Sequence, residues 1–166
     1  MDLAPRIDLF TIYRVSFHVV LVEPEIPPNT GNIARLCLAA GAVLHLIEPL
    51  GFSIDERALR RAGMDYWEHC DIRTWKSFAE FERDSGVRRK FFLTTKTKKP
   101  YWEAAFEDGD ALVFGRESRG LPESLLHDNK PWCLTIPMAV QARSLNLATA
   151  TGIVLYEAIR QTQCPQ

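Results

Sequence analysis

The sequence predicts an α/β fold: a single domain with a mostly parallel sheet flanked by helices. Short β-rich apolar runs alternate with stretches of helical periodicity from residue 17 onward, and this alternation is typical of βαβ units. The 166 residues, 46% apolar and 25% charged, suit one globular domain with its own core. This composition excludes a disordered, fibrous or coiled-coil chain, and its apolar runs are too short to cross a bilayer.

Five strands are expected, each followed by a turn signal or a polar loop. The first is apolar except for His18, which favours burial on both faces of a parallel sheet. Proline follows the first, second and fifth strands, and a glycine-containing loop follows the fourth. The five runs cover residues 17–22, 43–47, 91–95, 110–114 and 132–136.

Four helices complete the alternation. The first is expected to begin at a cap on Asn29 or Thr30 and to end at Gly41, which suits the left-handed position after a helix. The others are expected at 55–62, 74–83 and 144–161. The predicted inner faces are Ile33, Leu36, Cys37 and Ala40 in the first helix, Trp75, Phe78, Ala79 and Phe81 in the third, and Leu147, Ala150, Val154, Leu155 and Ala158 in the last.

We expect the domain to span residues 17–161. Residues 1–16 are predicted to be an N-terminal extension, disordered or foreign to the natural protein, and residues 162–166 a C-terminal tail. The four cysteines lie 33, 63 and 31 residues apart, without the short spacing of a metal site or a redox motif. These features favour a reduced, cytoplasmic chain. A net charge of −1 means that a nucleic-acid partner would need local basic patches.

Three loops at the predicted carboxyl ends of strands are rich in Gly, Asn, Arg and Pro: 23–35, 115–122 and 137–146. Ligands bind outside these ends in open parallel sheets. The first loop opens a helix and could face an anion, but it lacks the three glycines of a dinucleotide fingerprint. In the second, Leu121 and Pro122 replace the Lys and Ser/Thr of a Walker motif.

Each loop also has an ordinary structural interpretation. The first can be a proline-stiffened turn with an Asn cap, and the second a surface turn with weakly paired charges. In the third, Ser144 can cap the last helix, although this leaves Asn146 unexplained because Asn is an indifferent helix former. The histidines match no metal or hydrolase motif, and we expect structural roles for His18, His45, His69 and His127.

Taken together, the three loops resemble the motifs of the SPOUT methyltransferases, in the branch that methylates ribose 2′-hydroxyls of RNA. Segments 23–32, 59–66 and 91–96 resemble the enzymes of that branch that act on the wobble position of tRNA. The resemblance extends from about residue 17 to 161 and is specific, because three separated motifs occur in the right order. It implies a C-terminal deep trefoil knot, which ordinary topology rules would not suggest. It also implies a homodimer packed through the knot region and the N-terminal helix.

The resemblance implies that the knot binds S-adenosylmethionine and that no metal is needed. The reaction would transfer its methyl group to the ribose 2′-oxygen of cytidine or modified uridine at tRNA position 34, which requires alignment and removal of the hydroxyl proton. By position in the motifs, the catalytic residues would be Asn29, Arg35, Glu117, Ser144 and Asn146. The cofactor-binding residues would be Leu93, Thr94, Gly115, Glu117, Gly120, Ile136, Met138 and Ser144.

The role of Arg35 has two interpretations. A guanidinium, with a pKa above about 12, is almost always protonated and is a poor proton acceptor. Either Arg35 is strongly perturbed and acts as the general base, or it stays charged and stabilises the developing alkoxide. We favour the second interpretation.

RNA contact would come from local basic patches, with aromatic side chains nearby to stack on unpaired bases. The ordinary alternative is that these are solvated charges and partly buried aromatics. Because no separate RNA-binding domain is evident, we expect a small exposed element such as an anticodon loop. The expected RNA-binding residues are Arg60, Arg61, Arg88, Arg89, Lys96, Lys98 and Lys99, with Tyr66, Trp67, Tyr101 and Trp102 as stacking candidates.

Two other functions stay open from the sequence. One is a SPOUT enzyme that acts on ribosomal RNA or on another tRNA loop, since the motifs encode cofactor and ribose rather than base sequence. The other is a non-catalytic module that binds RNA or S-adenosylmethionine. The complete set of five catalytic candidates counts against this module. A nicotinamide oxidoreductase is disfavoured because the glycine fingerprint is missing.

Overall fold

The computed structural model describes residues 16–54 and 67–163. Several sequence predictions lie outside these ranges. They are the N-terminal extension as far as residue 15, the short helix at 55–62, Arg60, Arg61, Tyr66 and the end of the C-terminal tail.

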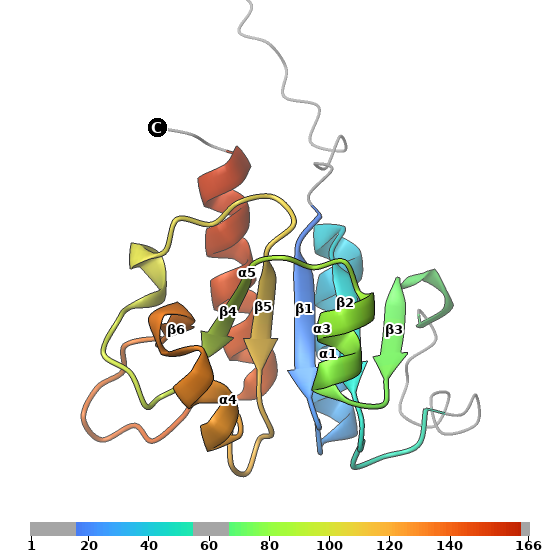
Figure 1. Cartoon of the computed structure of the whole chain (residues 1–166), viewed down its shortest axis with the longest axis horizontal. Helices are drawn as coiled ribbons and strands as arrows, with labels where there is room; N and C mark the ends of the chain where they lie inside the picture. Colours follow the sequence, from blue (N-terminus) through green and yellow to red (C-terminus); the bar gives the residue numbers. More distant parts are fainter. Residues whose placement is uncertain (1–15, 55–66, 164–166) are drawn as a thin grey trace, which may run out of the picture.

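The described chain forms a six-stranded sheet in which every hydrogen-bonded pair of strands is parallel. The order is β3-β2-β1-β5-β4-β6, so all carboxyl ends lie along one edge, at the bottom of Figure 1. The strands are β1 (His18–Val22), β2 (Val43–Ile47), β3 (Ile72–Trp75), β4 (Lys90–Leu93), β5 (Ala111–Phe114) and β6 (Cys133–Leu134). The predicted α/β class with a parallel sheet is confirmed.

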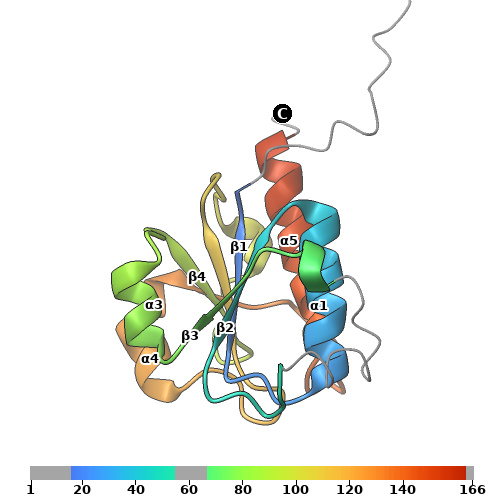
Figure 2. The same cartoon turned by 90° about the vertical axis from the view of Figure 1, so that its right-hand side faces the viewer.

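Helices cover both faces of this sheet. Figure 2 shows α1 (Pro27–Ala40) and α5 (Leu147–Gln163) on one face, and α3 (Phe78–Asp84) and α4 (Glu123–Asp128) on the other. Side chains of β1 alternate between the two layers: Val19 and Leu21 join the core under α1 and α5, and Val20 and Val22 join the core under α3. Burial on both faces explains why every residue of this strand after His18 is apolar.

The sequence pattern missed two elements, β3 and α4, and began the helix that corresponds to α3 too early. Residues 72–75 form an edge strand, where a helix had been expected to begin at Thr74. Helix α3 starts only at Phe78, because Ser77 accepts a hydrogen bond from the backbone N–H of Glu80 at 3.1 Å and caps it. Helix α4 was not predicted, because its single amphipathic turn and a half gives too short a periodic signal.

Helix α1 begins earlier than its predicted cap. Pro27 and Pro28 occupy its first two positions, where the missing N–H groups cost nothing, and Ile26 is the N-cap residue. The expected cap on Asn29 or Thr30 is therefore wrong: both residues are buried inside the first turn. The predicted end is confirmed, since Gly41 has φ of 68° and donates back to the last turn.

Helix α5 begins at Leu147, and its capping residue is Asn146 rather than Ser144. The side-chain oxygen Oδ1 of Asn146 accepts hydrogen bonds from the N–H groups of Ala148 at 2.9 Å and Thr149 at 3.2 Å. The predicted cap on Ser144 is wrong, and the cap accounts for the Asn that the sequence pattern left unexplained.

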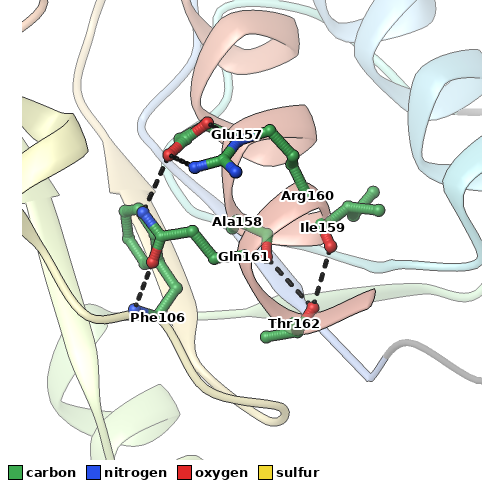
Figure 3. A network of polar contacts seen from close by, with 7 residues as sticks. All are labelled: Phe106, Glu157, Ala158, Ile159, Arg160, Gln161 and Thr162. Atoms are coloured by element: carbon green, nitrogen blue, oxygen red, sulfur yellow. Dashed lines mark hydrogen bonds and ion pairs between the residues drawn. The ribbon is translucent and has the colours of Figure 1, made fainter. Parts of the chain in front are cut away.

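The other end of α5 is tied to the chain that leads into β5. Gln161 accepts a hydrogen bond from the N–H of Phe106 at 3.0 Å, and its own amide donates to Glu157 at 2.8 Å (Figure 3). Arg160 also pairs with Glu157. The hydrogen bond to Phe106 holds the C-terminal part of α5 against the chain that leads into β5.

A hydrogen-bonded row of aromatic side chains lies inside the α3 layer. The indole of Trp75 donates to Nδ1 of His45 at 3.0 Å, and Nε2 of His45 lies 2.9 Å from Nδ1 of His18. Because an indole N–H only donates, His45 carries its proton on Nε2 and donates to His18. Burial, with His18 and Arg73 adding to it, lowers the pKa of His45 from 6.5 to about 3. Burial also lowers the pKa of His18.

The stability of the protein should therefore fall as the pH drops below about 6.5. Between that pH and about 3, the unfolded chain binds a proton on His45 that the folded chain does not. Each such proton contributes a slope of up to about 1.4 kcal/mol per pH unit. Urea unfolding between pH 5 and 7.5 measures this slope. It should flatten in His45→Gln and stay unchanged in His127→Gln, whose side chain is exposed; equal slopes in all three proteins would contradict the prediction.

Candidate functional site

A cavity of about 560 Å³ opens at the carboxyl edge of the sheet. Its walls come from the ends of β4, β5 and β6, the first turns of α1 and α5, and the loops 115–121 and 138–146. This volume falls within the range of about 300–1,000 Å³ that is usual for small-molecule and cofactor sites. The three loops singled out in the sequence meet here, as expected for an edge where parallel strands end.

One chain of hydrogen bonds joins the three loops. Nδ2 of Asn29 donates to the carboxylate of Glu117 at 3.1 Å, and Oδ1 of Asn29 accepts from Nδ2 of Asn146 at 2.9 Å. We call Glu117, Asn29 and Asn146 the polar chain. Its members come from the loop after β5, from the first turn of α1 and from the cap of α5.

The direction of the polar chain is set at both of its ends. Oδ1 of Asn146 faces the N–H donors of the α5 cap, so its Nδ2 must point to Asn29. A carboxylate only accepts, so Asn29 must present its Nδ2 to Glu117. Each amide therefore has one orientation that satisfies its partners.

Glu117 also holds the two residues that lead into α1. Its two carboxylate oxygens accept from the backbone N–H groups of Glu25 at 2.9 Å and Ile26 at 3.2 Å, and Ile26 has no capping side chain of its own. A negative charge at a helix N-terminus is also favoured by the helix dipole. The side chain that completes the cavity wall thus stabilises the start of α1.

Gly115 lets the backbone of Gly120 and Leu121 pass closer than any residue with a side chain would allow. A Cβ atom at this position would lie 2.1 Å from the carbonyl carbon of Gly120 and 2.2 Å from the nitrogen of Leu121. Gly120 has open space around it, but its φ of +70° is one that L-residues rarely adopt. The loop therefore folds back onto its own start, leaving its backbone exposed to the cavity.

Comparison with known proteins identifies the family to which this chain belongs. A family model described as the SpoU rRNA Methylase family matches residues 16–156. The chain belongs to the SpoU rRNA methylase family. The tRNA (cytidine(34)-2'-O)-methyltransferase of Escherichia coli K12 is 47% identical over 150 residues, which are 89% of this chain and 95% of that protein.

Two solved structures support the same family. One, described in terms of the 2-OH methylation of C/U34 on tRNA, has 48% identity and a TM-score of 0.80, and covers 89% of this chain and 96% of its own. The other is the SpoU methyltransferase AviRb from Streptomyces viridochromogenes in complex with AdoMet. It has 27% identity and a TM-score of 0.71, and covers 93% of this chain and 64% of its own. The resemblance to RNA methyltransferases is confirmed.

Most of the residues expected from the SpoU motifs line the one cavity. Among the catalytic candidates, Asn29, Glu117, Ser144 and Asn146 do so. All the cofactor candidates do as well, namely Leu93, Thr94, Gly115, Glu117, Gly120, Ile136, Met138 and Ser144. Their meeting in space is an observation of geometry; their roles remain predictions.

Arg35 is the catalytic candidate that does not line the cavity. Its exposed side chain lies on α1, six residues after Asn29, which is about 9 Å further along the helix axis. The cavity of one SpoU chain therefore contains the polar chain and the predicted cofactor residues without this arginine.

The expected RNA-binding residues are divided between two edges of the sheet. Arg88 and Arg89 precede β4, whereas Lys96, Lys98 and Lys99 follow it, and the strand between them is about 13 Å long. Arg89 is occupied within the fold: it pairs with Glu107 and Asp110 and lies over the ring of Trp132. Lys96 lines the cavity and pairs with Glu123 at 2.9 Å.

The cavity also contains polar residues that the sequence pattern did not single out. Arg119 and Arg143 line it with exposed side chains, and neither forms an ion pair with another described residue. Ser118 lines it beside Glu117 and contacts Glu25. Charge or position after a strand could have indicated the arginines, but the contact with Glu25 joins residues 93 apart and has no sequence signal.

Among residues 16–54 and 67–163, no cluster of His, Cys, Asp or Glu could hold a metal ion.

Substitutions at the two loop glycines should separate the close approach from the unusual backbone angle. Gly115→Ala places a methyl group inside the backbone of Gly120 and should lower the free energy of unfolding by about 2 kcal/mol or more. Gly120→Ala meets open space and should cost only about 1 kcal/mol of backbone strain. Urea denaturation of both variants tests this order. A Gly115→Ala protein as stable as Gly120→Ala would contradict the geometry.

Proposed function

We propose that this chain is an S-adenosylmethionine-dependent tRNA methyltransferase that methylates the ribose 2′-hydroxyl of the wobble nucleotide, cytidine or uridine at position 34. One observation carries the proposal: the polar chain and its cavity occur in a chain 47% identical, over 89% of its length, to the Escherichia coli tRNA (cytidine(34)-2'-O)-methyltransferase. A substrate on ribosomal RNA is an outcome that the experiment below distinguishes.

The cavity walls fit the proposed cofactor. Leu93, Ile136 and Leu121 give it an apolar floor at the strand ends, and the backbone around Gly115 is bare because a side chain there would collide with the returning loop. A purine ring needs such an apolar surface, with backbone groups at its polar edge. When bound, S-adenosylmethionine supplies an activated methyl group on its sulfonium. Leu93, Thr94, Gly115, Gly120, Ile136, Met138 and Ser144 would hold it.

Glu117 and the two asparagines would position the ribose rather than exchange protons with it. The carboxylate of Glu117 already accepts three N–H hydrogen bonds, and both ends of the Asn29 amide are engaged. An oriented amide at the cavity wall can align the 2′-oxygen with the methyl group, and alignment of this kind supplies much of the rate enhancement in group transfer.

Arg119 and Arg143 are suited to the phosphates that flank this ribose. Both line the cavity, and neither has an ion-pair partner among the described residues. Guanidinium groups bind phosphate oxygens in a bidentate manner. Two such groups at the mouth of the cavity would give a chain of net charge −1 the local attraction that RNA binding needs.

We also propose that the chain is knotted at this edge. β6 lies beyond β4 at one end of the sheet, whereas α5 packs beside α1 over the centre. The segment between them, residues 135–146, must therefore return across the ends of β4 and β5. Residues 94–101 run alongside it, with hydrogen bonds of 2.9 Å from Thr94 to Leu134 and from Tyr101 to Thr135. This arrangement favours threading of the return segment behind a neighbouring loop.

A homodimer would complete the site. Leu38 on α1 and Tyr156 on α5 are 41% and 51% exposed, and their helices lie side by side on the outer face (Figure 2). Pairing through this face would cover both apolar side chains. Because Arg35 is exposed on α1 and does not line the cavity of its own chain, it would enter the cavity of the second copy. There its positive charge would stabilise the developing alkoxide.

The domain would comprise residues 17–161, with the segments before and after it outside the catalytic unit. No helix among the described residues is long and apolar enough to cross a membrane. We propose that the enzyme acts in the cytoplasm, because tRNA and S-adenosylmethionine are both present there.

Methylation of tRNA from a strain that lacks the corresponding enzyme tests the function. Purified protein with S-adenosylmethionine should add a 2′-O-methyl group to the first anticodon nucleotide, mapped by mass spectrometry of nuclease fragments. Arg35→Ala should lower the rate by about 100-fold or more, because a charge that stabilises the transition state is lost. Methylation at another nucleotide would contradict the wobble assignment, and methylation of ribosomal RNA alone would contradict the tRNA assignment.

Mixed dimers test whether Arg35 acts across the interface. Arg35→Ala and Asn29→Ala proteins, each inactive alone, are unfolded together, mixed in equal amounts and refolded. If Arg35 serves the second copy, one site of each mixed dimer is intact and activity should recover to about a quarter of wild type. A refolded wild-type sample is the control. Recovery of wild-type controls without recovery in the mixture would contradict a shared site.

A further inference from the structure

Two loops at the cavity bind each other, because a carboxylate from each loop accepts hydrogen bonds from the other loop. The carboxylate of Glu117 accepts from the backbone N–H of Glu25 at 2.9 Å, as described above. In return, the carboxylate of Glu25 accepts from the backbone N–H of Ser118 at 3.0 Å and from its hydroxyl at 2.9 Å. We call Glu25, Glu117 and Ser118 the crossed clamp. Each loop thus holds the backbone of the other.

Both sequence neighbours of Glu117 are bound to the loop after β1, one through the crossed clamp and the other through an ion pair. Ser118, the residue after it, is bound by Glu25, and Arg116, the residue before it, forms an ion pair with Glu23. Three consecutive residues of the loop after β5 are therefore attached to the loop after β1. With its neighbours fixed, Glu117 loses little further conformational entropy when it binds Asn29.

The backbone of Glu25 is supported from its other side by the loop after β2. The N–H of Gly51 donates to the carbonyl of Pro24 at 2.9 Å. A Cβ atom at position 51 would lie 2.8 Å from the Cα and the carbonyl oxygen of Glu25. The backbone of Glu25 is thus fixed by contacts other than those with Ser118, and its carboxylate binds Ser118 from a fixed position.

We propose that Glu25 is a positioning residue for the methyl transfer: it fixes Ser118, and through Ser118 it fixes Glu117 and the amide of Asn29. This inference rests on the proposed function. Glu25 does not line the cavity, so it would not contact the ribose or the cofactor. Its effect passes through the polar chain, which orients the wall that faces the 2′-oxygen.

Removal of the Glu25 carboxylate should lower kcat more than it changes cofactor binding. In Glu25→Ala, Glu117 keeps its donors but loses the fixed neighbour, and a displacement of the aligned groups by about 1 Å can cost about 100-fold in rate. We expect kcat to fall by about 10- to 100-fold, with the KM for S-adenosylmethionine within about 3-fold of wild type. Steady-state assays on tRNA that lacks the modification give both constants.

Two further variants separate positioning from a general loss of structure. Glu25→Gln keeps one oxygen acceptor for Ser118 and should recover most of kcat. Ser118→Ala removes the hydroxyl but leaves the backbone N–H, so it should lower kcat by only a few-fold. The double variant Glu25→Ala/Ser118→Ala should be no slower than Glu25→Ala, because both changes remove the same contact. Additive losses in the double variant would overturn the inference.

Glu103→Ala is the matched control, because Glu103 is exposed and its side chain forms no ion pair or hydrogen bond with a described residue. It should leave kcat and KM unchanged. Wild-type activity on tRNA with an unaltered kcat in Glu25→Ala would overturn the positioning role alone. An inactive wild-type protein would instead contradict the proposed function. A kcat loss in Glu25→Ala that merely matches its loss of folded protein, measured by circular dichroism, would also overturn the inference.

Discussion

Helix α1 starts without a capping side chain of its own, and its N-cap residue Ile26 is held by a carboxylate 91 residues further along the sequence. Glu117 accepts from the backbone N–H groups of Glu25 and Ile26, just before α1, and with the same carboxylate orients Asn29. The chain that leads into α1 and the cavity wall are therefore held by the same carboxylate. The site cannot be assembled in one loop while the other is out of place, because each supplies donors that the other must accept.

This dependence explains which features the sequence could predict. The strands at 43–47 and 111–114 and the end of α1 at Gly41 follow from local patterns, so apolar runs and a single glycine were sufficient signals. The start of α1 was misplaced because Asn29 is a good capping residue, yet its side chain is engaged by Glu117 and Asn146. A hydrogen bond between residues 88 apart leaves no periodic trace. The cavity residues were predicted instead from the resemblance to a family, whose motifs include residues that meet in space although no local pattern brings them together.

The basic residues show the same limit in a different way. In the sequence, 88–99 is one cluster; in space, β4 divides it between opposite edges of the sheet. Arg89 is paired with Asp110 and Glu107, and such pairs serve the fold more than a ligand. Of the basic residues in this cluster, Lys96 lines the cavity, and Arg119 and Arg143, which lie outside the cluster, line it as well. For a protein near electrical neutrality, the local position of each charge decides what it can bind.

The fixed direction of the polar chain also bears on how the protein ages. Hydrolysis of the Asn29 side-chain amide to a carboxylate would turn its donor into an acceptor that faces the carboxylate of Glu117. Two negative oxygens would then share a site built for an N–H and an oxygen. The replacement of a single nitrogen atom by an oxygen from water, with hardly any change in shape, would place repelling charges between the loop after β5 and α1. The arrangement of the whole site thus depends on the chemical integrity of one buried amide.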